Sequence, residues 1–148
     1  MKLTRFDFLY SLLILLITIV AVFDLFINIG RSANMDGLIH TTTIAMFGEA
    51  ITQGEFPVRW VDGFGNYGFP VGIIAHQLPT YLGSVINFIV NDPTTSFNIV
   101  SFIGLLFSNV FFYMFLRLYF NPEASFLGTF LFNFAPYRII NLYIRGAI

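Results

Sequence analysis

Cysteine is absent from the 148 residues, and charged residues are scarce, at 10% of the chain. The missing cysteine excludes disulfide bonds, thiol nucleophiles and thiolate metal ligands, and it leaves the redox compartment undecided. Soluble domains carry roughly 25% charged residues, so the low charge excludes an ordinary soluble domain. The net charge is −1 and no basic face is present, so the electrostatic pattern of a nucleic-acid-binding protein is missing as well. We expect no nucleic-acid partner.

Apolar residues are correspondingly frequent in this chain. Hydrophobic residues make up 57% of the chain, aromatic residues 19%, and the mean hydropathy is +0.79. Long apolar runs use most of the length, which leaves no room for a second domain. The composition predicts a single all-α, polytopic transmembrane domain (residues 1–148) whose first partner is membrane lipid.

The first apolar run covers residues 8–29 and predicts a transmembrane helix. At 1.5 Å per residue it is about 33 Å long, enough for a hydrocarbon core of about 30 Å. Lys2 and Arg5 precede the run and no basic cluster follows it, so the positive-inside rule places the N-terminus in the cytoplasm. The run is longer than the core of a cleaved signal peptide. We expect a multi-pass protein of the plasma or inner membrane.

Residues 30–96 carry most of the polar side chains and predict an outer loop. Within it, residues 35–53 predict a helix, with Ser32 or Asn34 available as the N-cap and Gly54 just beyond the end. The apolar face of this segment is imperfect. We therefore expect an amphipathic helix that lies in the membrane interface.

Asp36 and His40 form the best polar constellation in this loop. They stand at positions i and i+4 of the predicted helix, so both side chains lie on one face and can reach the same small volume.

The run 69–90 is long enough to cross the membrane, yet it contains His76 and Pro79. Two topologies stay open. If the run spans, Arg117 falls on the outer side; if it is broken or re-entrant, Arg117 is cytoplasmic, as the positive-inside rule prefers. The re-entrant topology also requires a polar cavity beside the broken backbone.

Two later runs, 97–118 and 124–142, predict further transmembrane helices. Asn121 and Pro122 stand between them and predict a turn. Small and polar residues in the run 97–118 are typical of close helix packing.

Motifs of soluble enzymes are absent: the chain has no P-loop, no G-x-S-x-G and no H-E-x-x-H. The glycines from Gly63 to Gly68 imitate a dinucleotide fingerprint, but they follow no predicted strand and open no helix, so they indicate a turn. His40 and His76 are candidate metal ligands, and the simpler alternative is that each is a neutral, hydrogen-bonded histidine.

Several short segments occur in a fixed order between the apolar runs. They are Met35 to His40, Gly54 to Trp60, Gly65 to Pro70, Ala135 to Arg138 and Tyr143 to Ala147. In these segments and their order the chain resembles the N-terminal part of the polytopic GT-C glycosyltransferases. The resemblance is greatest to the bacterial membrane proteins named as 6-pyruvoyl-tetrahydropterin synthase-related, and it covers nearly the whole chain.

This resemblance implies a membrane-embedded glycosyltransferase that takes a sugar from a polyprenyl-phosphate donor and moves it to an acceptor on the extracytoplasmic face. The acidic residue of the family's first outer loop matches Asp36, which implies a catalytic base or a ligand of a divalent metal such as Mg or Mn. The structural alternative is that Asp36 complements the dipole of its own helix.

Four further side chains are candidates for substrate binding: His40, Arg59, Arg138 and Arg145. A guanidinium offers a bidentate fork to phosphate. The alternative for the three arginines is interfacial anchoring, together with Trp60, Tyr137 and Tyr143.

The chain departs from the resemblance in one respect. GT-C enzymes have many more spanning helices, and Ile148 falls where their second outer loop would begin. Two cases stay open, a piece of a longer protein and a truncated product without activity of its own. Other classes are a transporter or flippase piece, which the broken run around Pro79 suggests, and a non-catalytic subunit of a larger membrane partner.

Overall fold

The computed structural model describes residues 5–28, 36–63, 65, 67–74 and 76–146. The helices are α1 (Arg5–Ile27), α2 (Gly37–Thr52), α3 (Val71–Ile74), α4 (Gln77–Val90), α5 (Pro93–Leu116), α6 (Pro122–Asn133), α7 (Pro136–Ile140) and the π-helical turn η2 (Asn141–Arg145). Within the described residues the one β feature is an isolated bridge between Val61 and Phe69. The predicted all-α class is confirmed.

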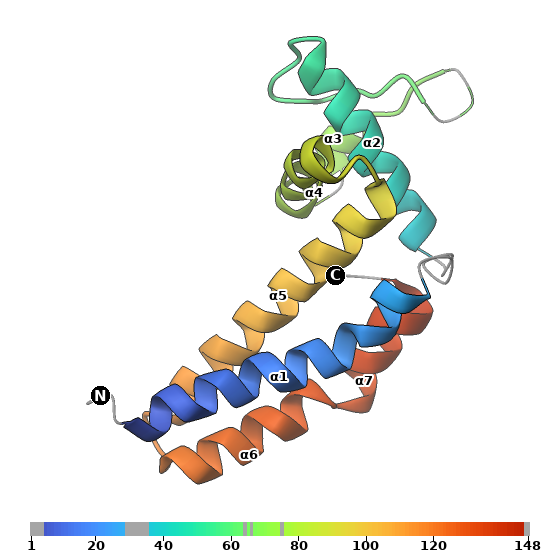
Figure 1. The fold of residues 1–148 in the computed structure, drawn as a ribbon. Coiled ribbons are helices and arrows are strands. Elements are labelled where there is room, and N and C mark those ends of the chain that lie inside the picture. The colour runs from blue at the N-terminus through green and yellow to red at the C-terminus, as the bar shows by residue number, and fades with distance from the viewer. Residues whose placement is uncertain (1–4, 29–35, 64, 66, 75, 147–148) are drawn as a thin grey trace.

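The helices form two units that share α5 (Figure 1). In the first, which we call the bundle, α5 packs against α1 and α6, and α7 with η2 continues from α6. In the second, which we call the head, α2 and α4 pack against each other and against α5. Val58 and Val61, from the loop that follows α2, pack against Phe47 and Ala50 of α2. The long helix α5 therefore fixes the head relative to the bundle.

Two helices of the described chain are long and apolar enough to cross a membrane, Asp7–Ile27 within α1 and Pro93–Leu116, which is α5. They suggest a membrane location. Helix α5 begins earlier than the predicted run 97–118 because Asp92 caps it, accepting the Thr95 N–H at 2.8 Å, and because Pro93 suits the first helical position.

The predicted run 124–142 is not one continuous helix. Helix α6 ends at Asn133, and α7 starts again at Pro136. Proline lacks the N–H that would continue the ladder, and it disfavours helical backbone in the residue before it. Pro136 therefore interrupts the run.

The structure also divides the run 69–90. Helix α3 ends at Ile74 and α4 begins at Gln77, with Pro79 in the first turn of α4, where a missing N–H costs nothing. With 14 residues, α4 is about 21 Å long, which is shorter than a hydrocarbon core of about 30 Å.

The predicted helix 35–53 is present as α2. Asp36 occupies its N-cap position, and Gly54 follows its end in the left-handed conformation with φ +88°, as expected of a residue that terminates a helix. Ser32, Asn34 and Met35 lie outside the described residues. Because Asp36 holds the N-cap position of α2, the prediction that Ser32 or Asn34 caps this helix is wrong.

The bundle buries polar side chains beside apolar ones such as Ile14, Val22 and Leu25, and its outer surface is apolar. Its fully buried side chains include Thr18, Ser101, Asn109, Ser125, Thr129 and Asn133, and its exposed ones include Phe8, Leu12, Leu16, Val20, Phe107, Phe111, Leu127 and Leu131. Asn109 Nδ2 donates to Thr18 Oγ1 at 2.9 Å and to Asn133 Oδ1 at 2.7 Å. This one side chain links α1, α5 and α6, in the manner of helices that associate in lipid.

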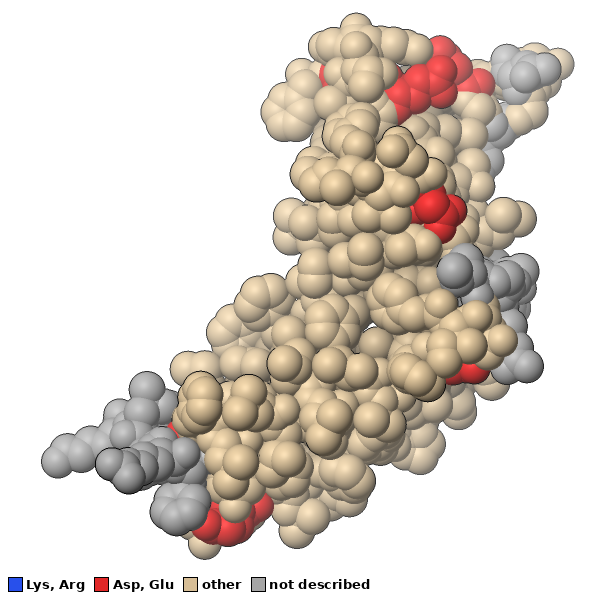
Figure 2. Space-filling view, viewed as in Figure 1, with Lys and Arg blue, Asp and Glu red and all other residues tan. Residues whose placement is uncertain are grey.

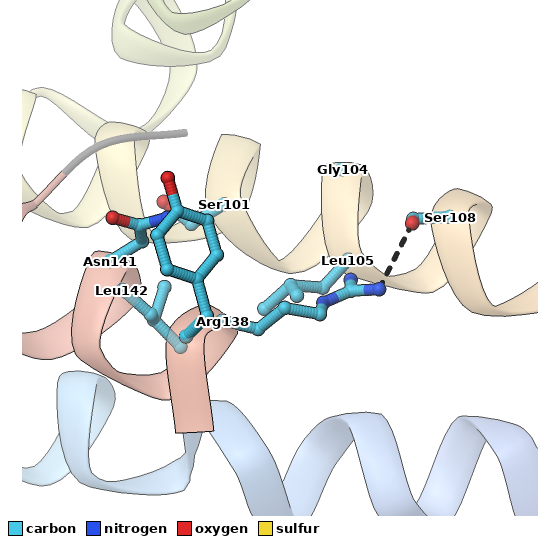
Figure 3. Close-up of a pocket in the computed structure, with 8 residues that line it drawn as sticks. Ser101, Gly104, Leu105, Ser108, Arg138, Asn141 and Leu142 are labelled. Atoms are coloured by element: carbon cyan, nitrogen blue, oxygen red, sulfur yellow. Dashed lines mark hydrogen bonds between the residues drawn. The ribbon is translucent and has the colours of Figure 1, made fainter. Parts of the chain in front are cut away.

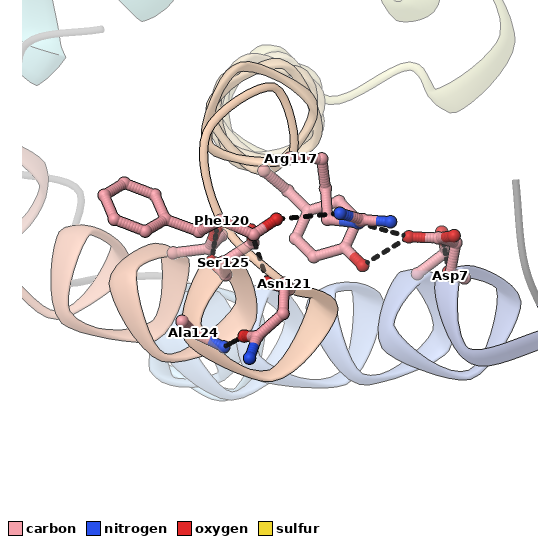
Figure 4. Close-up of polar contacts among 9 residues, drawn as sticks. Asp7, Arg117, Phe120, Asn121, Ala124 and Ser125 are labelled. Atoms are coloured by element: carbon pink, nitrogen blue, oxygen red, sulfur yellow. Dashed lines mark hydrogen bonds and ion pairs between the residues drawn. The ribbon is translucent and has the colours of Figure 1, made fainter. Parts of the chain in front are cut away.

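A buried ion pair closes the N-terminal end of the bundle (Figure 4). Arg117 Nε lies 2.7 Å from Asp7 Oδ1, and the Tyr113 hydroxyl donates to the same oxygen at 2.9 Å. The predicted turn follows directly, with Asn121 accepting the Ala124 N–H at 2.9 Å to cap α6. The start of α1 is thereby held against the α5–α6 turn.

The head differs from the bundle in its buried cluster and in the charges on its surface. Its buried cluster is apolar and consists of Phe47, Ala50, Val58, Val61 and Val71. Its exposed positions include the charged residues Glu49, Glu55, Arg59 and Asp62. Gly68 permits close packing here, because it has φ +71° and a Cβ at this position would lie 1.9 Å from Trp60 Nε1.

Candidate functional site

Asp36 lies at the junction of the head and the bundle and contacts the last turn of the described chain. Its Oδ2 atom is 3.3 Å from Arg145 Nε, and its N–H donates to the Arg145 carbonyl oxygen at 2.9 Å. The two residues are 109 positions apart. The structure thus brings together two residues that the sequence singled out separately.

The side chains of this pair stay accessible, with 39% of Asp36 and 58% of Arg145 exposed. Asp36 accepts no capping hydrogen bond from α2, so the partner of its carboxylate among the described residues is the guanidinium. Gly146 follows Arg145 in the left-handed conformation, with φ +69°. An open carboxylate beside a cation is well placed to meet a ligand that carries both hydroxyl and phosphate groups.

His40 stands one helical turn after Asp36 and lies flat against Phe97 of α5, with 5.5 Å between the ring centroids and 10° between the ring planes. Burial lowers the pKa of His40 below its ordinary value of 6.5; the Asp36 charge opposes this shift and His76 adds to it. The imidazole is therefore neutral at pH 7. Its contribution to stability is complete above pH 6.5 and is lost as the pH falls, because the unfolded chain then binds the proton more readily.

His76 occupies the N-cap position of α4 and is exposed. Together with His40, Thr43 and Thr80 it lines a small cavity of about 60 Å³. The structure therefore brings both histidines to one cavity.

A metal centre is not assembled by the described residues. No group of three or more His, Asp or Glu side chains among them is placed to hold a metal ion. Asp36 has a guanidinium as its neighbour where a metal site would need further oxygen or nitrogen ligands. The divalent metal stays a prediction that rests on the resemblance, and no step below depends on it.

Arg138 points inward, into a cavity of about 380 Å³ between α5 and the α7–η2 run (Figure 3). Its Nη1 atom is 3.2 Å from Ser108 Oγ, and its guanidinium carbon lies 3.9 Å from the centroid of the Phe132 ring. An arginine that anchored the chain at the membrane surface would extend outward. The anchoring alternative therefore does not describe Arg138.

No carboxylate among the described residues lies within ion-pair distance of Arg138. The cavity offers it neutral partners, with Ser101, Ser108 and Asn141 among the lining residues. A partly buried arginine with only neutral partners among the described residues can pair with an anionic ligand. The cavity is suited to an anionic group.

Arg59 lies apart from these residues. It follows the C-terminal end of α2, whereas Asp36 precedes the N-terminal end, and its backbone N–H donates to Glu55 Oε1 at 3.2 Å. Figure 2 shows acidic side chains gathered at the end of the head farthest from the bundle. A hollow of about 100 Å³ is lined there by Glu49, Glu55, Asp62 and Trp60, among others. The structure therefore does not bring Arg59 to the Asp36 site.

Sequence reasoning missed the residues that surround Arg138. Ser108 is one of the small and polar residues of the run 97–118 that indicate helix packing, and no pattern in the sequence indicates Asn141. No local sequence pattern predicts the contact between Arg138 and Ser108, because the two residues are 30 positions apart.

No protein-family model, no curated protein and no solved structure matches this chain. Its function is therefore inferred from its residues and their geometry.

Proposed function

We propose that this chain is the N-terminal part of a membrane-embedded glycosyltransferase that moves a sugar from a polyprenyl-phosphate donor to an acceptor on the extracytoplasmic face. The observation that carries the proposal is the contact between Asp36 and Arg145. It joins the first and the last of the segments on which the resemblance rests. Segments that are distant in sequence and meet at one accessible point are expected of a shared site.

In this proposal Asp36 is the general base. Its carboxylate accepts the proton of the acceptor hydroxyl, and the acceptor oxygen forms a bond to the sugar C1 atom. The bond between C1 and the phosphate oxygen breaks, and its electron pair leaves with the polyprenyl phosphate. Arg145, beside Asp36, is placed to attract the phosphate and to keep the acceptor hydroxyl and the sugar donor aligned for reaction.

The cavity around Arg138 supports a donor site next to this base. Arg138 and Arg145 lie on one helical run, seven positions apart, which corresponds to about 10 Å along the axis. A phosphate in the cavity would supply the counter-charge that Arg138 lacks, while an apolar tail could continue along the exposed side chains of the bundle. The donor phosphate would thus be held within reach of the Asp36 end.

The arrangement of the bundle supports a cytoplasmic N-terminus. Arg117 contacts Asp7, so the end of α5 and the start of α1 lie at the same end of the bundle. Arg5, at the start of α1, and Arg117 then lie at the same end of the bundle, which fits the positive-inside rule if this end is cytoplasmic. Because α1 is a candidate span that lies between the N-terminus and α2, Asp36 falls on the opposite side.

The test is Asp36→Asn in the complete protein, with sugar transfer measured from a polyprenyl-phosphate donor in membranes. We expect transfer to fall by about 10²–10⁴, the usual contribution of a general base, while membrane insertion is unchanged. Glu49→Gln is the matched control, because it removes an exposed carboxylate from the same helix outside the site. Undiminished transfer by well-inserted Asp36→Asn would exclude Asp36 as the base.

One observation favours a second candidate, a transporter or flippase piece. The run 69–90 is broken between α3 and α4, and discontinuous helices form substrate sites in transporters. Substrate movement across reconstituted vesicles, without any covalent transfer of sugar, would establish this candidate in place of the first.

A further inference from the structure

Helix α4 has its polar side chains inside and its large apolar side chains outside. Thr80, Gly83 and Ser84 are buried against the protein. On the opposite face Leu78, Leu82, Val85 and Ile89 are exposed by 80%, 36%, 54% and 81%. These four residues recur at intervals of four, three and four, so they form one stripe along the helix, which we call the α4 stripe.

The inner face of α4 is fully engaged with the protein. Ser84 Oγ donates to the Ile44 carbonyl of α2 at 2.8 Å, while the buried Thr80 Oγ1 donates to the carbonyl of His76, the N-cap of α4, at 3.0 Å. Gly83 allows close approach, because a Cβ there would lie 2.5 Å from Ile44 Cδ1. Because the opposite face of α4 makes these contacts, α4 cannot rotate about its axis to bury the α4 stripe without breaking them.

The C-terminal part of the neighbouring helix α2 shows the ordinary pattern, in which Ile44, Phe47 and Ala50 are buried and Glu49 is exposed. The first turns of α2 differ, because Leu38 and Ile39 are exposed there. The exposed face of α4 is therefore apolar, whereas the C-terminal part of α2 exposes a charged residue. Contact with water accounts for the pattern in this part of α2, and contact with an apolar medium accounts for the pattern in α4.

The position of α4 along the chain indicates which apolar medium it meets. Only Asn91 and Asp92 separate α4 from α5, and α5 is a candidate membrane span. Figure 1 shows α4 nearly end-on and α5 lengthwise, so the two helices cross where α5 begins. The end of a spanning helix lies near the edge of the hydrocarbon core, and α4 is held at that level.

The surrounding sequence also fits hydrocarbon. No Asp, Glu, Lys or Arg occurs between Asp62 and Asp92, so α4 carries no charge that lipid would have to accommodate. Its length of about 21 Å is too short for a perpendicular crossing but suits a helix that lies within one leaflet.

We propose that α4 is embedded in one membrane leaflet, with the α4 stripe among the phospholipid acyl chains and its hydroxyl-bearing face on α2 and α5. The α4 side of the head then contacts lipid, and the acidic end of the head stays in water. This inference concerns the membrane surface and holds whether or not the chain transfers sugar.

The absence of native cysteine makes a direct test simple. Single Cys substitutions at Leu82, Val85 and Ile89, each carrying a nitroxide label, are compared in phosphatidylcholine vesicles with Glu49→Cys on α2. Collisions with molecular oxygen, which concentrates in lipid, and with a water-soluble nickel chelate are measured by electron paramagnetic resonance. We expect the ratio of oxygen to nickel collisions to be several-fold higher at the stripe than at Glu49.

Two outcomes would overturn the proposal. A ratio at the stripe equal to that at Glu49 means that the stripe faces water. Immobile labels that neither reagent reaches mean that protein covers the stripe, as a second copy or a further helix would. Because the labelled positions are exposed, these substitutions leave the packing of α4 intact, and unchanged circular dichroism verifies it.

Discussion

The bundle and the α2 side of the head differ in which side chains they bury and which they expose. In the bundle, Asn109 and Asn133 are buried while Phe107 and Phe111 are exposed; in the head, Phe47 is buried while Glu49 is exposed. Both units are helical and belong to one chain, so the difference does not arise from secondary structure. It indicates that each unit is folded for a different solvent, lipid for the bundle and water for the outer surface of the head.

The difference changes which interactions hold each unit together. In water the head gains stability by burying apolar area. In lipid the bundle gains little from apolar burial, so close packing and hydrogen bonds between helices must supply its specificity. Matched substitutions in the two units therefore test the comparison.

The largest expected effect is that of Phe47→Ala in the head. Phe47 is 1% exposed and packs edge-on against Tyr81, with 5.1 Å between the ring centroids. Its loss leaves a cavity in the apolar cluster and lowers the local stability of α2 by about 3–5 kcal/mol. Hydrogen exchange of the α2 amides, in the protein reconstituted in lipid nanodiscs, measures this change.

Phe111→Ala is the control for that substitution. Phe111 is 63% exposed on the bundle, and lipid can fill the space that its ring leaves. We expect its effect on the exchange of the α5 amides to be under about 1 kcal/mol. Equal losses for the two substitutions would contradict the assignment of two solvents.

An intermediate effect is expected for Gly68→Ala in the loop of the head. The substitution places an alanine at φ +71° and drives its Cβ into the Trp60 indole. Gly65→Ala is the matched control, because Gly65 has φ +79° and no atom lies within 4 Å of a Cβ there. The left-handed backbone costs each variant about 1–2 kcal/mol, and Gly68→Ala loses more.

Trp60 is the single tryptophan of the chain, so its fluorescence separates the two glycine variants. The emission maximum should shift in Gly68→Ala and stay in place in Gly65→Ala. A shift in both variants would show that the loop responds to backbone strain and not to the contact with Trp60.

The smallest effect is expected for Asn109→Leu in the bundle. The substitution removes two hydrogen bonds, but Asn109 Oδ1 has no partner among the described residues, so an unsatisfied group disappears as well. Hydrogen bonds between membrane helices contribute about 0.6 kcal/mol on average and about 1.7 at most. Thermal unfolding in nanodiscs should show a loss in this range.

A double substitution sharpens this last result. Asn109 and Asn133 share one hydrogen bond, so Asn133→Leu should cost less in the Asn109→Leu background than in the native protein. Strictly additive losses would mean that the two amides do not cooperate in joining α5 and α6.

Much of the helical layout could be predicted from the sequence, because hydrophobic runs and proline act locally. The run 8–29 corresponds to α1, the Asn121–Pro122 turn is present, and α2 ends before Gly54 as expected. The break at Pro136 carried a signal in the sequence as well, because proline interrupts a helix wherever it falls inside one.

The candidate site could be predicted only in part. Asp36 and His40 follow from helical spacing, and Arg145 was a candidate, yet nothing local indicates that Arg145 meets Asp36. The inward direction of Arg138 and the pairing of Asp7 with Arg117 were also beyond sequence reasoning. Each depends on how helices pack, and such contacts join positions that are 30 to 110 residues apart.

The contact between Asp36 and Arg145 joins two points that enclose most of the chain. Bringing two points together across 109 residues has an entropic cost that rises with the length of the loop, and an exposed ion pair gains at most about 1 kcal/mol. The ion pair alone therefore cannot offset this entropic cost, and the contact depends on the packing of the helices between Asp36 and Arg145. The contact between Asp36 and Arg145 therefore forms only after these helices have packed, and a partly folded chain would lack the site.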